Sequence, residues 1–206
     1  MRTWIRFLSV LAILSAMAPG PAGASGIPLF TDWVSPAQRS RLQNLDIAFK
    51  DQEGRSGVLG ELIDKPVVIT FFYTRCQNST KCSLAVNRLG ALQRQLAQAG
   101  IDNKVRLLAI TYEPQFDTPE RISRYATDRG LRLGENALAL ELDTARHQRL
   151  VDELQAPVNY NAGWVNAHGV ELSLLDAGGR VVRKYHTLLW DNDQVVKDLK
   201  RVLTGK

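Results

Sequence analysis

Apolar residues gather along the chain in two kinds of run. Residues 67–73 (VVITFFY) form a continuous run of β-branched and aromatic side chains, which is typical of a strand buried on both faces. Residues 105–111 (VRLLAIT) predict a second buried strand. Residues 84–99 instead carry apolar side chains at spacings of three and four, which predicts a helix that ends at Gly100. Buried strands joined by a helix indicate an α/β fold.

Caps and turns mark the remaining elements. Thr118 followed by Pro119 has the pattern of a helix N-cap with proline at the first helical position. A turn at Ala177-Gly178-Gly179 joins two apolar runs, and this late hairpin makes the predicted sheet mixed. We predict a mixed central sheet flanked by helices. Its other elements are a hairpin at 47–50 and 56–59, helices at 118–129, 144–154 and 193–203, and strands at 170–175 and 181–185.

The N-terminal segment has the pattern of a targeting signal. Arg2 and Arg6 give a positive start, and residues 7–18 are almost wholly apolar. Small residues follow at Ala22-Gly23-Ala24, as at signal-peptidase sites, and the apolar stretch is short for a membrane span. We predict a secretory signal peptide at 1–24, a linker at 25–43 and one domain at 44–206. An uncleaved membrane anchor is the less favoured alternative.

Composition and charge exclude several classes of protein. The 206 residues are 45% hydrophobic and 23% charged, which is typical of a globular protein and excludes a wholly disordered chain. Removal of the predicted signal peptide takes away two arginines and no acid, so the net charge falls from +5 to +3. A weakly basic chain without a Lys/Arg cluster predicts no nucleic-acid partner. Export would place the protein in the periplasm or another oxidising compartment, with no stable membrane span after cleavage.

Cys76 and Cys82 are the only cysteines, which excludes a disulfide-dense scaffold and a four-cysteine zinc site within one chain. They lie between the first buried strand and the helix after it, at the strand end where α/β sheets place their sites. We expect Ser79 or Thr80 to cap this helix, which would put Cys82 in its first turn. There the helix dipole favours the thiolate, as does the basic residue that precedes each cysteine.

Two thiolates at this place support two kinds of chemistry. A thiolate is the soft ligand that copper prefers, and it is also the nucleophile of disulfide exchange. In an exchange reaction we expect Cys76 to attack and Cys82 to resolve the mixed disulfide. A structural disulfide that closes a short surface loop is the third interpretation.

The chain has three histidines. His168 comes directly before the strand at 170–175, in an Asn/Gly-rich loop at 159–169 that can face the cysteine loop in a sheet of this kind. An imidazole there would serve as a copper ligand, although an ordinary loop histidine has the same pattern. We predict that His147 lies on the surface of its helix and that His186 is structural or solvated.

The stretch 110–120 (ITYEPQFDTPE) closes the second buried strand and opens a helix. Asp117 is a candidate for capping the helix or turning the chain, and Glu113 for supporting a site from behind. A rigid loop bracketed by Pro114 and Pro119 explains the stretch equally well.

Together these segments resemble the Sco/SenC family over roughly residues 45–203. The resemblance rests on VVITFFYTRC, ITYEPQFDTPERISRYA and AHGVELSLLDAGGRVVRKY. The second block is the most specific, since the family commonly reads Asp-Pro-x-x-Asp-Thr-Pro-Glu followed by a tyrosine-containing helix. Glu113 replaces the first aspartate, and the other positions match at Pro114, Asp117, Thr118, Pro119, Glu120 and Tyr125.

The resemblance implies a thioredoxin-like fold and copper bound by Cys76, Cys82 and His168. It also implies a role in assembling the binuclear copper centre of cytochrome oxidase, as metallochaperone, as thiol–disulfide reductase or as both. Two features depart from the family. Its motif is C-x3-C followed by proline, whereas this chain has C-x5-C followed by Ser83, and the family usually keeps a membrane anchor.

We therefore expect an exported Sco-like copper-binding protein that delivers copper to cytochrome oxidase copper sites or maintains their thiols. Its partner would be a cytochrome oxidase subunit or another thiol–disulfide protein. The alternative is a metal-independent periplasmic thiol–disulfide oxidoreductase, in which Cys76 and Cys82 are the catalytic pair. A non-catalytic interaction domain stapled by a disulfide is the third candidate.

Overall fold

The computed structural model describes residues 33–205 except 40, 43–45, 77 and 188–189. The predicted signal peptide and the first part of the predicted linker lie outside these residues. The strands are β1 (Ala48–Asp51), β2 (Ser56–Val58), β3 (Val67–Phe72), β4 (Arg106–Thr111), β5 (Ala137–Leu142), β6 (Val158–Asn161), β7 (Trp164–His168), β8 (Leu172–Leu175) and β9 (Val181–Tyr185). The α-helices are α1 (Leu84–Gln98), α2 (Pro119–Thr127), α3 (Thr144–Glu153) and α4 (Asn192–Leu203).

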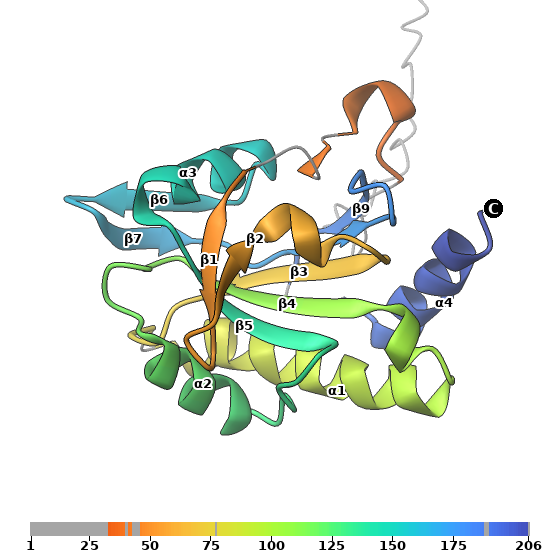
Figure 1. Ribbon diagram of the computed structural model, residues 1–206, viewed down its shortest axis with the longest axis horizontal. Coiled ribbons are helices and arrows are strands. Elements are labelled where there is room, and N and C mark those ends of the chain that lie inside the picture. The colour runs from red at the N-terminus through yellow and green to blue at the C-terminus, as the bar shows by residue number, and fades with distance from the viewer. Residues whose placement is uncertain (1–32, 40, 43–45, 77, 188–189, 206) are drawn as a thin grey trace, which may run out of the picture.

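Seven strands form one mixed sheet in the order β2-β1-β5-β4-β3-β8-β9 (Figure 1). The three central strands β5, β4 and β3 are parallel, and the antiparallel strands β1 and β8 lie on either side of them. The predicted mixed sheet is thus confirmed. Because β3 and β4 are parallel neighbours, the segments that follow them leave the sheet at the same edge, where the candidate site lies.

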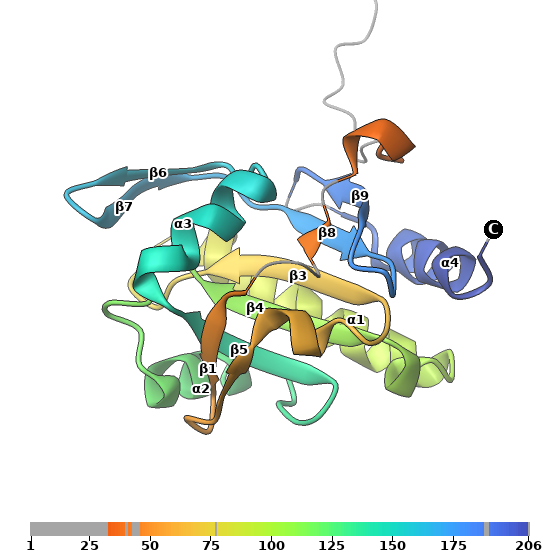
Figure 2. The same ribbon diagram turned by 45° about the horizontal axis from the view of Figure 1, so that its top comes forward.

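Helices cover both faces of the sheet. The helices α1, α2 and α4 cover one face, and α3 lies over the other (Figure 1 and Figure 2). Alternate side chains of β3 enter the two cores: Val68 and Phe72 pack under α1, whereas Ile69 and Phe71 pack on the side of α3. Burial on both faces is the physical reason for the continuous apolar run. Among the described residues, none of the helices has both the length and the apolar character needed to cross a bilayer.

Strand β5 was not predicted, although it lies in the middle of the sheet between β1 and β4. Its sequence, ALALEL, consists of residues that favour helices. The strand conformation is imposed by hydrogen-bonded neighbours on both sides, and five of its six residues are buried.

The prediction of a loop at 159–169 is wrong, because most of this segment belongs to a β-hairpin. The strands β6 and β7 are joined by a two-residue turn at Ala162 and Gly163, with φ of 48° and 82°. Positive φ at both central residues is the requirement of a type I′ hairpin turn. The hairpin is a separate two-stranded sheet that projects beside α3 (Figure 1 and Figure 2).

Trp33, Val34 and Leu42, within the predicted linker, contact the outer strand β9 and the turn before it. Trp33 pairs with Arg183, and the backbone N–H of Val34 donates to the carbonyl of Val182. Leu42 is fully buried, and its N–H donates to the carbonyl of Gly179. This part of the segment therefore packs onto the domain.

Candidate metal centre

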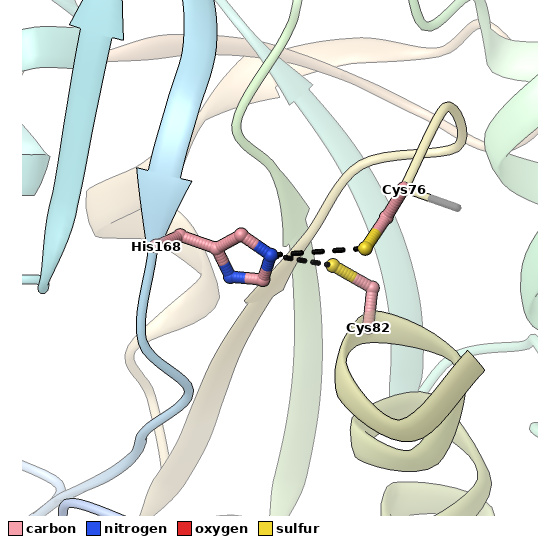
Figure 3. Close-up of side chains that lie close together, drawn as sticks. All are labelled: Cys76, Cys82 and His168. Atoms are coloured by element: carbon pink, nitrogen blue, oxygen red, sulfur yellow. Dashed lines mark hydrogen bonds between the residues drawn. The ribbon is translucent and has the colours of Figure 1, made fainter. Parts of the chain in front are cut away.

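Cys76, Cys82 and His168 come together at the edge of the sheet where β3 ends. The Nε2 atom of His168 lies 3.7 Å from Sγ of Cys76 and 3.6 Å from Sγ of Cys82. Figure 3 shows the imidazole and the two sulfurs pointing toward one another. These three ligand atoms all lie within 4.8 Å of one another. Cys76 and His168 border a cavity of about 390 Å³ between the cysteine loop and β7. Residues far apart in sequence thus form one cluster of two sulfurs and one nitrogen.

A single π-helical turn, η4 (Ser79–Ser83), follows Cys76 and leads into α1. Cys82 lies in this turn and is buried, whereas Cys76 is half-buried in the loop before it. The capping side chain is Asn78, whose Oδ1 accepts from the N–H and the hydroxyl of Thr80. The predicted cap at Ser79 or Thr80 is therefore wrong, while Cys82 does lie in the first turn.

His168 is oriented by its own neighbours at the end of β7. The Nδ1–H donates to the carbonyl of Gly169 at 2.6 Å, which leaves Nε2 as the nitrogen that faces the sulfurs. The rings of Tyr73 and Tyr112 pack against the imidazole at centroid distances of 5.3 and 5.9 Å. Lys81 donates to the carbonyl of His168 at 3.2 Å. A fixed tautomer and a packed ring are the features that hold a metal-binding histidine in place.

The two cysteines differ in acidity. The pKa of Cys76 is lowered to about 4, mainly because its thiolate accepts a hydrogen bond from the Cys82 thiol. The pKa of Cys82 is raised, because its thiol donates to Cys76 and because it is buried. The pair therefore holds one thiolate, on the more exposed sulfur.

Alkylation of the reduced protein should reveal this difference. Because the Cys76 pKa is about 4, its rate with iodoacetamide should be nearly constant between pH 6 and 8. An ordinary cysteine would react roughly tenfold faster per pH unit in this range. Mass spectrometry of quenched samples would measure the modification of each residue. In Cys82→Ala, which removes the main hydrogen-bond donor to Cys76, the rate should regain its pH dependence; a steep profile for the unmodified pair would contradict the assignment.

Asp117 is fully buried and joins the cysteine loop to β4. Its carboxylate accepts from the backbone N–H of Thr74 at 3.0 Å and from the hydroxyls of Thr74 and Thr111. The helix α2 begins at the N-cap Thr118 without a side-chain capping bond. Of the two predicted roles, Asp117 therefore holds the cysteine loop in place and does not cap α2.

Glu113 is also fully buried and contacts two segments of the site. Its oxygens accept from Nε and Nη2 of Arg75, both at 2.8 Å, and from the backbone N–H of Val165 at 3.0 Å. Arg75 directly precedes Cys76, and Val165 lies on the strand that ends in His168. Glu113 thus supports the cluster from behind, as the sequence suggested.

The other two histidines lie outside the cluster. The prediction that His147 is on the surface is wrong, since it is 5% exposed and packs with Leu150 and Val151 on the buried face of α3. Its Nε2 lies 3.0 Å from the hydroxyl of Tyr160. The side chain of His186 is half exposed, and its Nδ1 lies 3.6 Å from the buried carboxylate of Glu171.

Burial of His147 makes the stability of the protein depend on pH. Burial lowers its pKa from 6.5 to about 4, so between these values the unfolded chain binds a proton that the folded chain does not. Stability should therefore fall as pH decreases from 7 to 4, by about 3 kcal/mol from this residue. Urea unfolding of the wild type and His147→Gln at both pH values would measure the difference. Equal acid sensitivity of the two proteins would show that another group is responsible.

The cluster fits a soft first-row metal ion. The S···N distances of 3.6 and 3.7 Å are shorter than the roughly 4.3 Å that a metal–sulfur and a metal–nitrogen bond span together, so Nε2 and either sulfur lie within bonding reach of one ion. Thiolate sulfur and imidazole nitrogen form the donor set that copper and zinc accept. The three residues are therefore capable of holding such an ion with little rearrangement.

A mixed sheet with parallel central strands, covered by helices on both faces and bearing cysteines after β3, defines a thioredoxin-like protein with a candidate soft-metal site. The sequence model of the SCO1/SenC family matches residues 38–204. The chain therefore belongs to the SCO1/SenC family.

Solved structures agree with this fold. A SCO1/SenC family lipoprotein from Bacillus anthracis is 20% identical with a TM-score of 0.67, covering 86% of this chain and 99% of that one. BsSco, described as a member of the Sco family of cytochrome c oxidase assembly proteins with a disulfide switch, is 20% identical with a TM-score of 0.69, covering 85% and 100%. Bradyrhizobium japonicum ScoI with copper bound is 22% identical with a TM-score of 0.57, covering 76% and 96%. The comparison with curated proteins gave no match.

Proposed function

We propose that this protein is an exported copper-binding protein that delivers copper to cytochrome oxidase copper sites or maintains the thiols of those sites. The observation that carries the proposal is the convergence of Cys76, Cys82 and His168 within 4.8 Å in a member of the SCO1/SenC family. The related ScoI structure with copper bound and the description of BsSco as a cytochrome c oxidase assembly protein support it. Export rests on the signal pattern at 1–24.

In this proposal copper is the cargo, and each residue has a distinct task. The thiolate of Cys76 attracts the ion at the half-exposed side of the site, and Cys82 supplies the second sulfur from the buried side. His168 adds the nitrogen ligand through Nε2, since its Nδ1 is held by Gly169. The half-buried Cys76 beside an open cavity suits transfer to a partner, because the partner's own ligands can approach the cargo from that side.

A second function has its own support in the unequal acidity of the cysteines. As a thiol–disulfide oxidoreductase, the Cys76 thiolate would attack a partner disulfide and release one partner thiolate, leaving a mixed disulfide. Cys82 would then lose its proton, attack Cys76 sulfur and release the second partner thiolate. The partner would gain two electrons, and Cys76 and Cys82 would end as a disulfide.

A copper titration decides between the two functions. Reduced protein without residues 1–24 is titrated with Cu(I) and then with Cu(II), and the bound metal and the absorption spectrum are recorded. One tightly bound copper per chain, with a thiolate charge-transfer band under Cu(II), supports the copper function. Absence of retained copper, together with a reversible two-electron titration of the cysteine pair, would reject it in favour of the oxidoreductase.

A transfer assay tests the delivery step itself. Copper-loaded protein is mixed with the metal-free copper domain of a cytochrome oxidase, and the spectrum of the binuclear centre is followed. The double variant Cys76→Ser, Cys82→Ser, pre-incubated with the same copper and desalted, is the control for free metal. Equal transfer from both proteins would show that the cysteine pair does not carry the cargo.

A further inference from the structure

The position of His168 depends on a hairpin that is separate from the main sheet. The strands β6 and β7 pair with each other and form no ladder with the seven-stranded sheet. Figure 1 and Figure 2 show the hairpin projecting beyond the body of the domain. His168 is the last residue of β7, whereas both cysteines belong to the segment after β3. Contacts between the hairpin and the body therefore decide how close the nitrogen ligand comes to the sulfurs.

One buried carboxylate links the hairpin to the cysteine loop. The side chain of Glu113 is completely buried, and its Oε1 accepts from both Nη2 of Arg75 and the N–H of Val165. The second oxygen accepts from Nε of Arg75. Two parallel N–H···O bonds fix the guanidinium plane against the carboxylate, which makes the pair directional as well as attractive.

The guanidinium of Arg75 is also stacked between two aromatic rings. Its central carbon lies 4.1 Å from the ring centroid of Trp164 and 4.7 Å from that of Phe116. Trp164 begins β7, so the stacking contacts the same strand that carries His168. Arg75 is joined by a peptide bond to Cys76. A planar, delocalised cation is required here, because lysine offers neither the fork nor the flat face.

We propose that the Arg75–Glu113 pair, with Trp164, is a positioning device that holds His168 against the two sulfurs. The effect of this device on copper binding rests on the proposed copper function. Since Cu(I) is satisfied by two thiolates while Cu(II) depends on the added imidazole, loss of the device weakens Cu(II) binding more than Cu(I) binding. Neither Arg75 nor Glu113 is one of the three candidate ligands. Both act on the site through the position of His168.

Three variants test the device. Arg75→Lys keeps the charge at a side chain that is 39% exposed, and Glu113→Gln keeps the size of the buried side chain. Arg121→Lys is the matched control, because Arg121 also stacks on Phe116, at 4.1 Å, and is bonded to the Phe116 carbonyl. Both test variants should lower Cu(II) affinity by roughly tenfold or more, the range found for residues that orient metal ligands. Cu(I) affinity should change little, and Arg121→Lys should match the wild type.

The same variants are examined without metal by hydrogen exchange. The N–H of Val165 and its neighbours in β7 should exchange faster in Arg75→Lys and Glu113→Gln than in the wild type or Arg121→Lys. With copper, a tenfold loss confined to Cu(II) would raise the copper reduction potential by about 59 mV.

The outcomes separate this inference from the proposed function. Equal losses of Cu(I) and Cu(II), or unchanged affinities, would overturn the positioning device. If the wild type retains no copper, the proposed function fails, and hydrogen exchange alone tests the positioning role. Faster exchange of β7 in the two test variants than in the wild type supports that role, and unchanged exchange overturns it. Should Glu113→Gln fail to fold, Arg75→Lys supplies both measurements.

Discussion

Replacement of His168 with alanine should reduce the affinity of the reduced protein for Cu(II) by roughly 100-fold or more. The change removes the nitrogen that lies 3.6–3.7 Å from both sulfurs, and Cu(II) would be left with two soft ligands. Cu(I) should remain bound to Cys76 and Cys82 with a smaller loss. Competition titrations with a chelator for each oxidation state would measure the two affinities, and the Cu(II) charge-transfer band should weaken in parallel.

The control for this prediction is another histidine of the same chain. His186→Ala removes a half-exposed imidazole that contacts Glu171 and lies outside the cluster. Its copper affinities should equal those of the wild type. If His168→Ala binds Cu(II) as tightly as the wild type does, the imidazole is not a ligand, and the site would be a two-sulfur site.

Replacement of Asp117 with alanine should lower the free energy of unfolding by about 3–5 kcal/mol. The carboxylate is fully buried and accepts three hydrogen bonds, from the backbone N–H of Thr74, from the Thr74 hydroxyl and from the Thr111 hydroxyl. Alanine leaves these donors without their acceptor, and water does not reach the fully buried Thr111. Urea unfolding followed by circular dichroism would measure the loss.

Asp128→Ala is the matched control for Asp117→Ala, because Asp128 is an exposed aspartate at the end of α2. It should change stability by less than about 0.5 kcal/mol. A small effect of Asp117→Ala would mean that the cysteine loop finds other partners for its donors. Because Thr74 lies two residues before Cys76, the variant should also change the alkylation rate of that cysteine.

The parts of the fold that sequence predicts are those in which local pattern and burial agree. Strands β3 and β4 are buried on both faces, and the continuous β-branched and aromatic run of β3 indicates this directly. Strand β5 has the same burial with residues that favour helices, so pairing with its neighbours decides its structure. The hairpin β6–β7 turns at Ala162-Gly163 rather than at an Asn-Gly or Asp-Gly pair, so the usual turn signal is absent.

The residues of the site likewise divide into those that the sequence predicts and those that it does not. The cysteines were predictable because they follow a buried strand, and His168 because of the family resemblance. The partners of Glu113 were not, since Arg75 lies 38 residues before it and Val165 lies 52 residues after it. His147 was misplaced because charged neighbours in the sequence hide the fact that its spacing to Leu150 and Val151 puts it on the buried face.

The π-helical turn at Ser79–Ser83 has a consequence for how such proteins are recognised. A π-helical turn contains more residues than an α-helical turn. Cys82 lies in this turn, directly before α1, and its sulfur still faces His168. The number of residues between the cysteines is therefore a poor measure of the distance between their sulfurs. Five residues between the cysteines leave the Cys–Cys–His cluster of this chain intact, so a search that requires C-x3-C would overlook it. A pattern that pairs two cysteines of free spacing with a distant hairpin histidine would find it.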